Sequence, residues 1–83
     1  MNMDEKRFNF TVTKKDGEDN FCVIATRDLA CPSWYRMHVA WSLNYPPTYW
    51  ASCPESELLM TIMDYIAQQY SADNLISVAM FVS

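Results

Sequence analysis

Hydrophobic and polar residues alternate from Phe8 to Thr26, and a period of two predicts β-strands. The Asp16-Gly17 dipeptide divides this segment and is a typical two-residue hairpin loop, because Gly accepts the positive φ of a type I′ turn. That loop pairs Val12 with Phe21, Phe10 with Val23 and Phe8 with Ala25 on one face. The other face receives Asn9, Thr11, Thr13, Asn20, Cys22 and Ile24. The sequence therefore predicts a hairpin with a single core face.

A second alternating segment covers residues 35–43, where every odd position is large and apolar. These positions are Tyr35, Met37, Val39, Trp41 and Leu43. The pattern favours a third strand. A helix beginning after Pro32 is the alternative, since Trp34, Met37, His38 and Trp41 lie at helical spacing. Residues 28–33 read as a connection, and residues 44–51, which contain Pro46 and Pro47, as an ordered aromatic loop.

Apolar residues then recur at intervals of three and four, which predicts a helix from about residue 54 to residue 70. Its apolar stripe comprises Leu58, Leu59, Ile62, Met63, Ile66 and Tyr70. Ser52 and Glu55 have the spacing of a capping box. Residues 75–83 alternate again and predict a last strand, with Ile76, Val78, Met80 and Val82 on one face.

These elements predict an α+β fold of two layers, a four-stranded, mostly antiparallel sheet (β-β-β-α-β) with one helix packed on one face. If the helix is a crossover, the last strand runs parallel to the third and to the first, which gives the order 3-2-1-4. We expect a single domain over residues 1–83, with a frayed lead-in at residues 1–7. The last strand is apolar on both faces, so a dimer or a partner that covers Ile24 and Phe81 is expected.

Composition narrows the class of protein. The chain of 83 residues is 51% hydrophobic and carries a net charge of −4, which predicts a folded, cytoplasmic protein. Six basic residues against ten acidic ones make a nucleic-acid partner unlikely by charge. The absence of a long apolar run predicts no membrane association.

The three cysteines and the single histidine form no recognisable chemical motif. Cys22, Cys31, Cys53 and His38 lack the close pair that a zinc site uses, so no metal and no cofactor are predicted. An odd number of cysteines favours reduced thiols over a disulfide framework. Cys31, Cys53 and His38 nevertheless support an alternative hypothesis, a thiol-based sensor or small enzyme.

The remaining candidate site is a cluster of aromatic residues in or beside the loops that flank the third strand. Its members are Trp34, Tyr35, Tyr45, Tyr49 and Trp50. Trp and Tyr are enriched at interaction hot spots, although two or three of them are expected simply to close the core. The main hypothesis is a small, non-enzymatic protein-binding module that binds another protein, itself, or both. A more specific form of this hypothesis is an inhibitor or modulator of a host protein, encoded by a phage or mobile element. On this hypothesis, Trp50→Ala abolishes association and leaves stability nearly unchanged.

Overall fold

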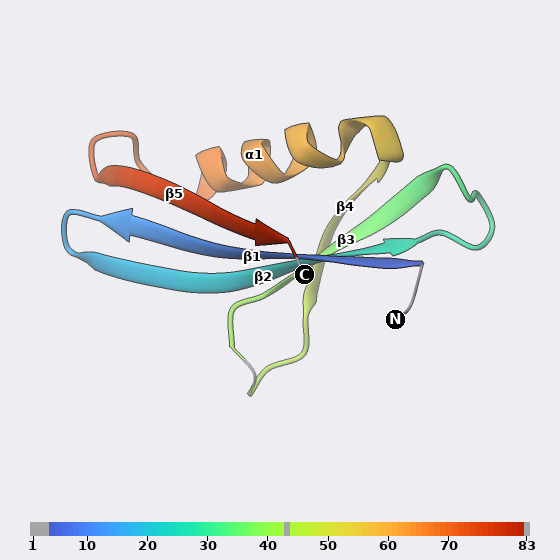
Figure 1. Ribbon diagram of the computed structural model, residues 1–83, viewed down its shortest axis with the longest axis horizontal. Helices are drawn as coiled ribbons and strands as arrows, with labels where there is room; N and C mark the ends of the chain where they lie inside the picture. Colours follow the sequence, from blue (N-terminus) through green and yellow to red (C-terminus); the bar gives the residue numbers. More distant parts are fainter. Residues whose placement is uncertain (1–3, 43, 83) are drawn as a thin grey trace.

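The computed structural model describes residues 4–42 and 44–82 of the chain. Within these residues, five strands form one sheet, and one α-helix lies over it (Figure 1). In chain order the elements are β1 (Glu5–Lys14), β2 (Gly17–Arg27), β3 (Trp34–Ala40), β4 (Thr48–Pro54), the 3₁₀ turn η1 (Glu55–Glu57), α1 (Leu58–Gln69) and β5 (Leu75–Val82). The α+β class is confirmed, and the sheet has one strand more than the four predicted.

The first hairpin forms with the predicted core face and a different register. Phe10 pairs with Phe21 and Phe8 with Val23, so the predicted pairing is wrong by two residues. A shift of two keeps every side chain on its face, and the apolar residues of β1 and β2 are buried as expected. Lys15 and Asp16 form the loop, and the positive φ lies at Gly17 (150°), which rules out a type I′ turn over Asp16-Gly17.

Contacts with the segment before β5 hold this hairpin turn in place. The backbone N–H of Lys15 donates to the carbonyl of Asn74 at 3.0 Å. The Asn74 side chain donates in turn to the Asp16 carboxylate at 3.1 Å. This hydrogen bond is the main reason that the pKa of Asp16 lies below its usual value. The turn is therefore coupled to the start of the last strand.

The alternating segment at residues 35–43 contains a strand, as its period of two predicts, and the alternative helix is wrong. Tyr35, Met37 and Val39 are buried on the face shared with the hairpin core. Leu43 lies outside the described residues, as do residues 1–3 of the predicted frayed lead-in and Ser83 of the last strand. Residues 5–7 of that lead-in are the beginning of β1.

The segment predicted as an aromatic loop contains the additional strand, β4. It pairs antiparallel with β3, and the register shifts by one residue between Met37 and His38. Met37 pairs with Ala51 and His38 with Tyr49, so Trp50 is an extra residue, as in a β-bulge. In an unbroken strand Trp50 would oppose His38 and Tyr49 would oppose Val39, so the bulge exchanges the faces of these two rings. Trp50 packs against the core, and Tyr49 lies on the opposite face beside His38.

The strand order is β4-β3-β2-β1-β5, so the predicted place of the last strand beside the first is confirmed. Its predicted direction is wrong, because β5 runs antiparallel to β1. Since β1 to β4 alternate in direction, β5 is parallel to β4. The helix is a crossover between two parallel strands as expected, and the unpredicted strand changes which two strands it joins.

The helix begins later than predicted and without the expected cap. Pro54 is the extended residue before η1, and no side chain caps either helical segment, so the capping box of Ser52 and Glu55 does not form. Leu58, Ile62 and Ile66 are buried against the sheet. Leu59 and Met63, which the predicted stripe includes, are exposed. Among the described residues, no helix has the length and apolar character needed to cross a membrane.

The core lies between α1 and the face of the sheet that it covers, here called the helix face. Aromatic side chains continue it along one side. Phe10 stacks on Phe21 with ring centres 5.3 Å apart, and Phe21 contacts Trp41 at 4.4 Å. The Trp41 indole N–H donates to the Tyr65 hydroxyl at 3.3 Å, and Tyr65 packs on Trp50 at 4.5 Å. This chain of rings joins β1, β2, β4 and the residue after β3 to the helix.

Candidate binding surface on the outer face of the sheet

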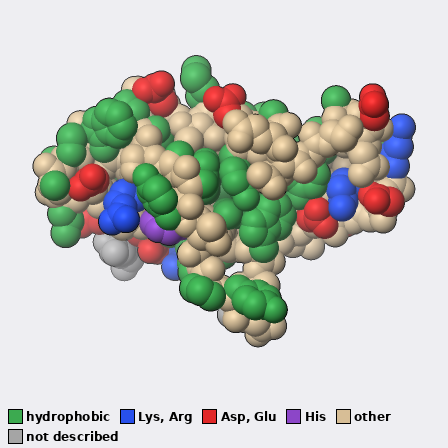
Figure 2. Space-filling view, turned by 180° about the vertical axis from the view of Figure 1, so that it is seen from behind, with side chains coloured by type: hydrophobic (Ala, Val, Ile, Leu, Met, Phe, Trp, Pro, Cys, Tyr) green, Lys and Arg blue, Asp and Glu red, His purple; other side chains and the backbone are tan. Residues whose placement is uncertain are grey.

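The face of the sheet opposite α1, here called the outer face, is covered by no helix of the part of the chain that the structure describes. The described residues of the β3–β4 loop, 41–42 and 44–47, project on this side, away from α1 (Figure 1). The same projection carries hydrophobic side chains in Figure 2. The outer face and this loop therefore form the candidate site.

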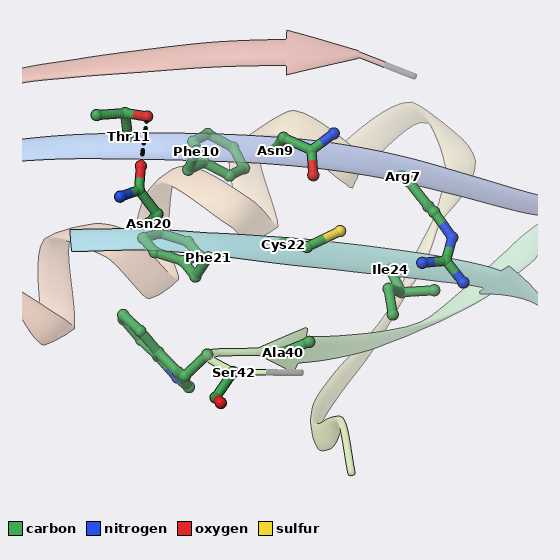
Figure 3. Close-up of a pocket in the computed structure, with 11 residues that line it drawn as sticks. Arg7, Asn9, Phe10, Thr11, Asn20, Phe21, Cys22, Ile24, Ala40 and Ser42 are labelled. Carbon is green, nitrogen blue, oxygen red and sulfur yellow. Dashed lines mark hydrogen bonds between the residues drawn. The ribbon is translucent and has the colours of Figure 1, made fainter. Parts of the chain in front are cut away.

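A hollow of about 300 Å³ lies on the outer face where β3 ends and β2 continues. Cys22, Ile24 and Ala40 form its apolar floor (Figure 3). The remaining lining residues are Arg7, Asn9, Phe10, Thr11, Asn20, Phe21, Trp41 and Ser42. An apolar floor with a few polar groups at the edge is the usual composition of a binding site.

Two of the polar groups at the edge are held in place by a hydrogen bond between strands. The Thr11 hydroxyl donates to the Asn20 side-chain carbonyl at 2.7 Å, across a directly opposed β1–β2 pair (Figure 3). Asn20 accepts this bond through its carbonyl oxygen, so the bond itself uses neither of its two amide N–H groups.

A second hollow of about 410 Å³ adjoins the first, and Arg7 and Ile24 line both. Arg7 donates to the Glu5 carboxylate at 2.8 Å, and this ion pair raises the pKa of Arg7. Pro47, at the end of the β3–β4 loop, lines the second hollow, whereas Trp41 and Ser42, at its start, line the first. The loop therefore begins beside the first hollow and ends beside the second.

Tyr45 belongs to the β3–β4 loop and is 74% exposed. Its backbone N–H donates to the Ser42 carbonyl at 3.4 Å. A large aromatic ring that is exposed to this degree on a projecting loop contributes little to the core. It offers apolar area together with a hydroxyl, which is the combination found at interaction hot spots.

Tyr49 is another exposed aromatic residue of this face, at 48%. Its ring contacts His38 edge-on at 5.5 Å, and the Arg36 guanidinium lies 5.5 Å from the ring centre. Its hydroxyl shares a hydrogen bond of 2.9 Å with Ser52. These contacts fix the ring in one orientation and place a cation beside it.

The other three aromatic residues of the predicted site do not lie together with Tyr45 and Tyr49. Tyr35 is fully buried on the helix face, and Trp50 is partly buried against Tyr65. Trp34 is partly exposed at the start of β3, where it pairs with Pro54 at the far end of β4. The structure therefore divides the predicted set into two surface residues, two core residues and one residue at the end of the sheet.

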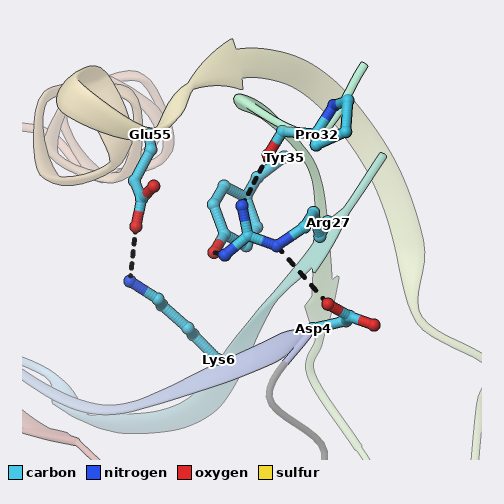
Figure 4. A network of polar contacts seen from close by, with 6 residues as sticks. All are labelled: Asp4, Lys6, Arg27, Pro32, Tyr35 and Glu55. Carbon is cyan, nitrogen blue, oxygen red and sulfur yellow. Dashed lines mark hydrogen bonds and ion pairs between the residues drawn. The ribbon is translucent and has the colours of Figure 1, made fainter. Parts of the chain in front are cut away.

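The buried Tyr35 belongs to a polar network at one end of the sheet (Figure 4). Arg27 donates to the Tyr35 hydroxyl at 2.6 Å, and its guanidinium lies 4.8 Å from the centre of the same ring. Arg27 also donates to the Pro32 carbonyl and pairs with Asp4 at 3.4 Å. This network explains why Tyr35 can be buried, since its hydroxyl is satisfied.

The residues of the thiol hypothesis are dispersed. Cys53 is buried on the helix face, Cys31 is exposed in the β2–β3 connection, and His38 lies on the outer face beside Tyr49. Cys22 lies on the floor of the hollow, and burial raises the pKa of its thiol, which disfavours the thiolate. No group of three or more metal-ligating side chains occurs within residues 4–42 and 44–82.

Comparison with known proteins finds no family model, no curated protein and no solved structure that matches the chain. The site must therefore be interpreted from its own residues. The alternation of the sequence places two floor residues of the hollow, Cys22 and Ile24, on the face opposite the core, and this pattern is the available signal for the floor.

Proposed function

We propose that this chain is a small, non-enzymatic protein-binding module that contacts another protein through the β3–β4 loop and the adjoining hollows of the outer face. The observation that carries the proposal is Tyr45, whose ring is 74% exposed on a loop that begins beside the first hollow and ends beside the second. Burying such a ring in an interface contributes roughly 1.5–3 kcal/mol of apolar transfer energy.

The chemistry of the surface supports a folded protein as the partner. The floor is apolar, the edge carries amide and hydroxyl groups, and Arg7 and Arg36 are its nearest cations. A partner that presents an apolar side chain next to a carboxylate fits this arrangement. The net charge of −4 argues against a nucleic acid in the same place. An inhibitor or modulator of a host protein, encoded by a phage or mobile element, is the finer form of this proposal and rests on size and composition.

Site-specific photocrosslinking tests the proposal. A benzophenone amino acid replaces Tyr45, and in a matched control it replaces Leu29, which is 83% exposed in the β2–β3 connection. We expect one protein of the native cell to crosslink at position 45 and not at position 29. The same protein should lose at least tenfold in affinity for Tyr45→Ala and keep its affinity for Leu29→Ala. Equal crosslinking at both positions, or none at position 45, would overturn the proposal.

Thiol labelling of the native protein tests the alternative, a thiol-based sensor or enzyme that uses Cys31, Cys53 and His38. We expect Cys31 to react first because it is exposed, Cys22 slowly because its thiol is partly buried, and Cys53 only on unfolding. A cysteine that reacts faster than free cysteine in the native state would favour the alternative.

A further inference from the structure

The last strand of the sheet is an edge strand with unusual composition. β5 (Leu75–Val82) pairs with β1 on one side and, within the described residues, is the end of the strand order. It contains no charged residue, no proline and no glycine. Edge strands are normally protected by such residues, because an unprotected edge pairs with another strand.

The opposite edge of the sheet shows this protection. β4 carries the β-bulge at Trp50 and ends at Pro54, and Pro46 and Pro47 precede it. Proline cannot donate a ladder hydrogen bond, and a bulge disrupts the row of donors and acceptors. β5 has its register shift only at its start, beside Lys14, so residues 77–82 form a regular edge. The two edges therefore differ in their capacity to accept a further strand.

Exposed apolar side chains gather around the unprotected edge. Of the twelve large hydrophobic side chains exposed among the described residues, six lie on β5 or on one flank of α1. They are Ile76, Met80, Phe81, Val82, Leu59 and Met63. Phe81 and Val82 are 63% and 66% exposed and lie on opposite faces of the strand, since they pair with Asn9 and Phe8.

The helix flank faces the same edge. At 100° per residue, Leu59 and Met63 lie on the side of α1 opposite Thr61 and Tyr65. Tyr65 packs on Trp50 of β4, so the flank with Leu59 and Met63 is turned toward the β1–β5 side of the sheet. Helix and strand together form one apolar strip along this edge.

We propose that a second copy of this chain covers the strip, by antiparallel pairing of β5 with β5 about a two-fold axis. Antiparallel pairing is self-complementary, and a register centred on Val78 or Ala79 keeps Met80 and Val82 of both copies on the helix face. No like charges meet, because β5 is uncharged although the whole chain carries −4. The pairing uses the one unprotected edge of each copy, so assembly stops at the dimer.

The available area suits such a dimer. The six side chains offer roughly 500 Å² per subunit, and the backbone edge adds to this, against roughly 800 Å² per partner in interfaces of standard size. We therefore expect a dissociation constant on the order of micromolar. This interface does not include the β3–β4 loop, so the test of the dimer is independent of the test of the proposed function.

Sedimentation of the 83-residue chain across about 1–200 µM measures the association directly. We expect a transition from the 9.7 kDa monomer to a species of twice that mass. Phe81→Lys and Met80→Lys should each raise the dissociation constant roughly a hundredfold, because the two-fold axis places each substitution in the interface twice and each replaces an apolar side chain there with a charge. Leu29→Lys, the matched control, places the same charge at an exposed residue in the β2–β3 connection and should leave it unchanged.

Hydrogen exchange on the unaltered chain gives a second readout that does not depend on the folding of any variant. Alternate amides of β5 should become protected as concentration rises, with no change in the β4 amides. A wild-type protein that is monomeric throughout, that forms larger assemblies, or whose dimer is indifferent to both β5 substitutions would overturn the proposal.

Discussion

Replacing Trp50 with Ala tests whether the β-bulge of β4 turns this side chain into the structure. Trp50 is partly buried, packs against the core and contacts Tyr65 with the two ring centres 4.5 Å apart. Complete truncation of a buried Trp costs about 3–5 kcal/mol, and an aromatic pair adds about 0.5–1.5 kcal/mol beyond area. Partial exposure reduces the sum, so we expect a loss of about 2–3 kcal/mol. This expectation replaces the near-neutral effect that the sequence alone suggests.

Tyr49→Ala is the matched control, since it removes the neighbouring ring of the same strand from the outer face. Tyr49 is about half exposed, so we expect its loss to cost about 1 kcal/mol or less. Urea titrations followed by circular dichroism measure both changes. In thermal melts the Trp50 variant should lose roughly 10–20 °C. Equal losses for the two variants, or a Trp50 variant within about 0.5 kcal/mol of wild type, would refute the assigned role of the bulge.

Three further substitutions test local features. Gly17→Ala should cost about 1 kcal/mol in urea titrations through backbone strain alone, because φ is +150° and no atom lies within 4 Å of the added Cβ. Tyr35→Phe should cost about 1.5 kcal/mol, because it removes the acceptor of the Arg27 hydrogen bond; no loss would show that this bond is immaterial. Burial, and then the hydrogen bond to Asp19, raises the pKa of Tyr70 above its ordinary value of 10.0. As the pH rises, the unfolded chain therefore loses the Tyr70 proton at a lower pH than the folded chain does. The stability that the protonated Tyr70 contributes is fully present below about pH 10 and is lost as the pH rises above it. Tyr70→Phe should flatten the fall in stability between pH 9 and pH 11, and an unchanged slope would contradict this.

Much of the sheet could be predicted because the period of two is strong in β1, β2 and β3. The faces were therefore assigned correctly even where the pairing was not. A shift of two residues leaves every face unchanged, so hydrophobic pattern alone cannot separate the register through Lys15-Asp16 from the one through Asp16-Gly17. Turn geometry separates them, and it depends on contacts with Asn74 that are distant in sequence.

The strand β4 could not be predicted from the same signal, because its bulge interrupts the alternation at Trp50 and prolines precede it. The missing strand also changes the predicted topology. Without β4, the helix is expected to join β3 to the last strand, which gives the last strand the reverse of its observed direction. The bulge also divides the predicted aromatic cluster, because it leaves Tyr49 exposed on the outer face and lets Trp50 pack inward.

The position of β1 between β2 and β5 has a consequence for how the protein is made. Phe8 pairs with Val82, more than seventy positions along the chain, whereas β1 pairs with β2 through a two-residue turn. During synthesis the first hairpin can therefore form early, but one edge of β1 stays without its neighbour until β5 leaves the ribosome. Closing so distant a pairing is slow, and a nascent chain with an open strand edge is prone to associate with others. β5, the last strand in chain order, therefore supplies the second neighbour of a strand that forms early.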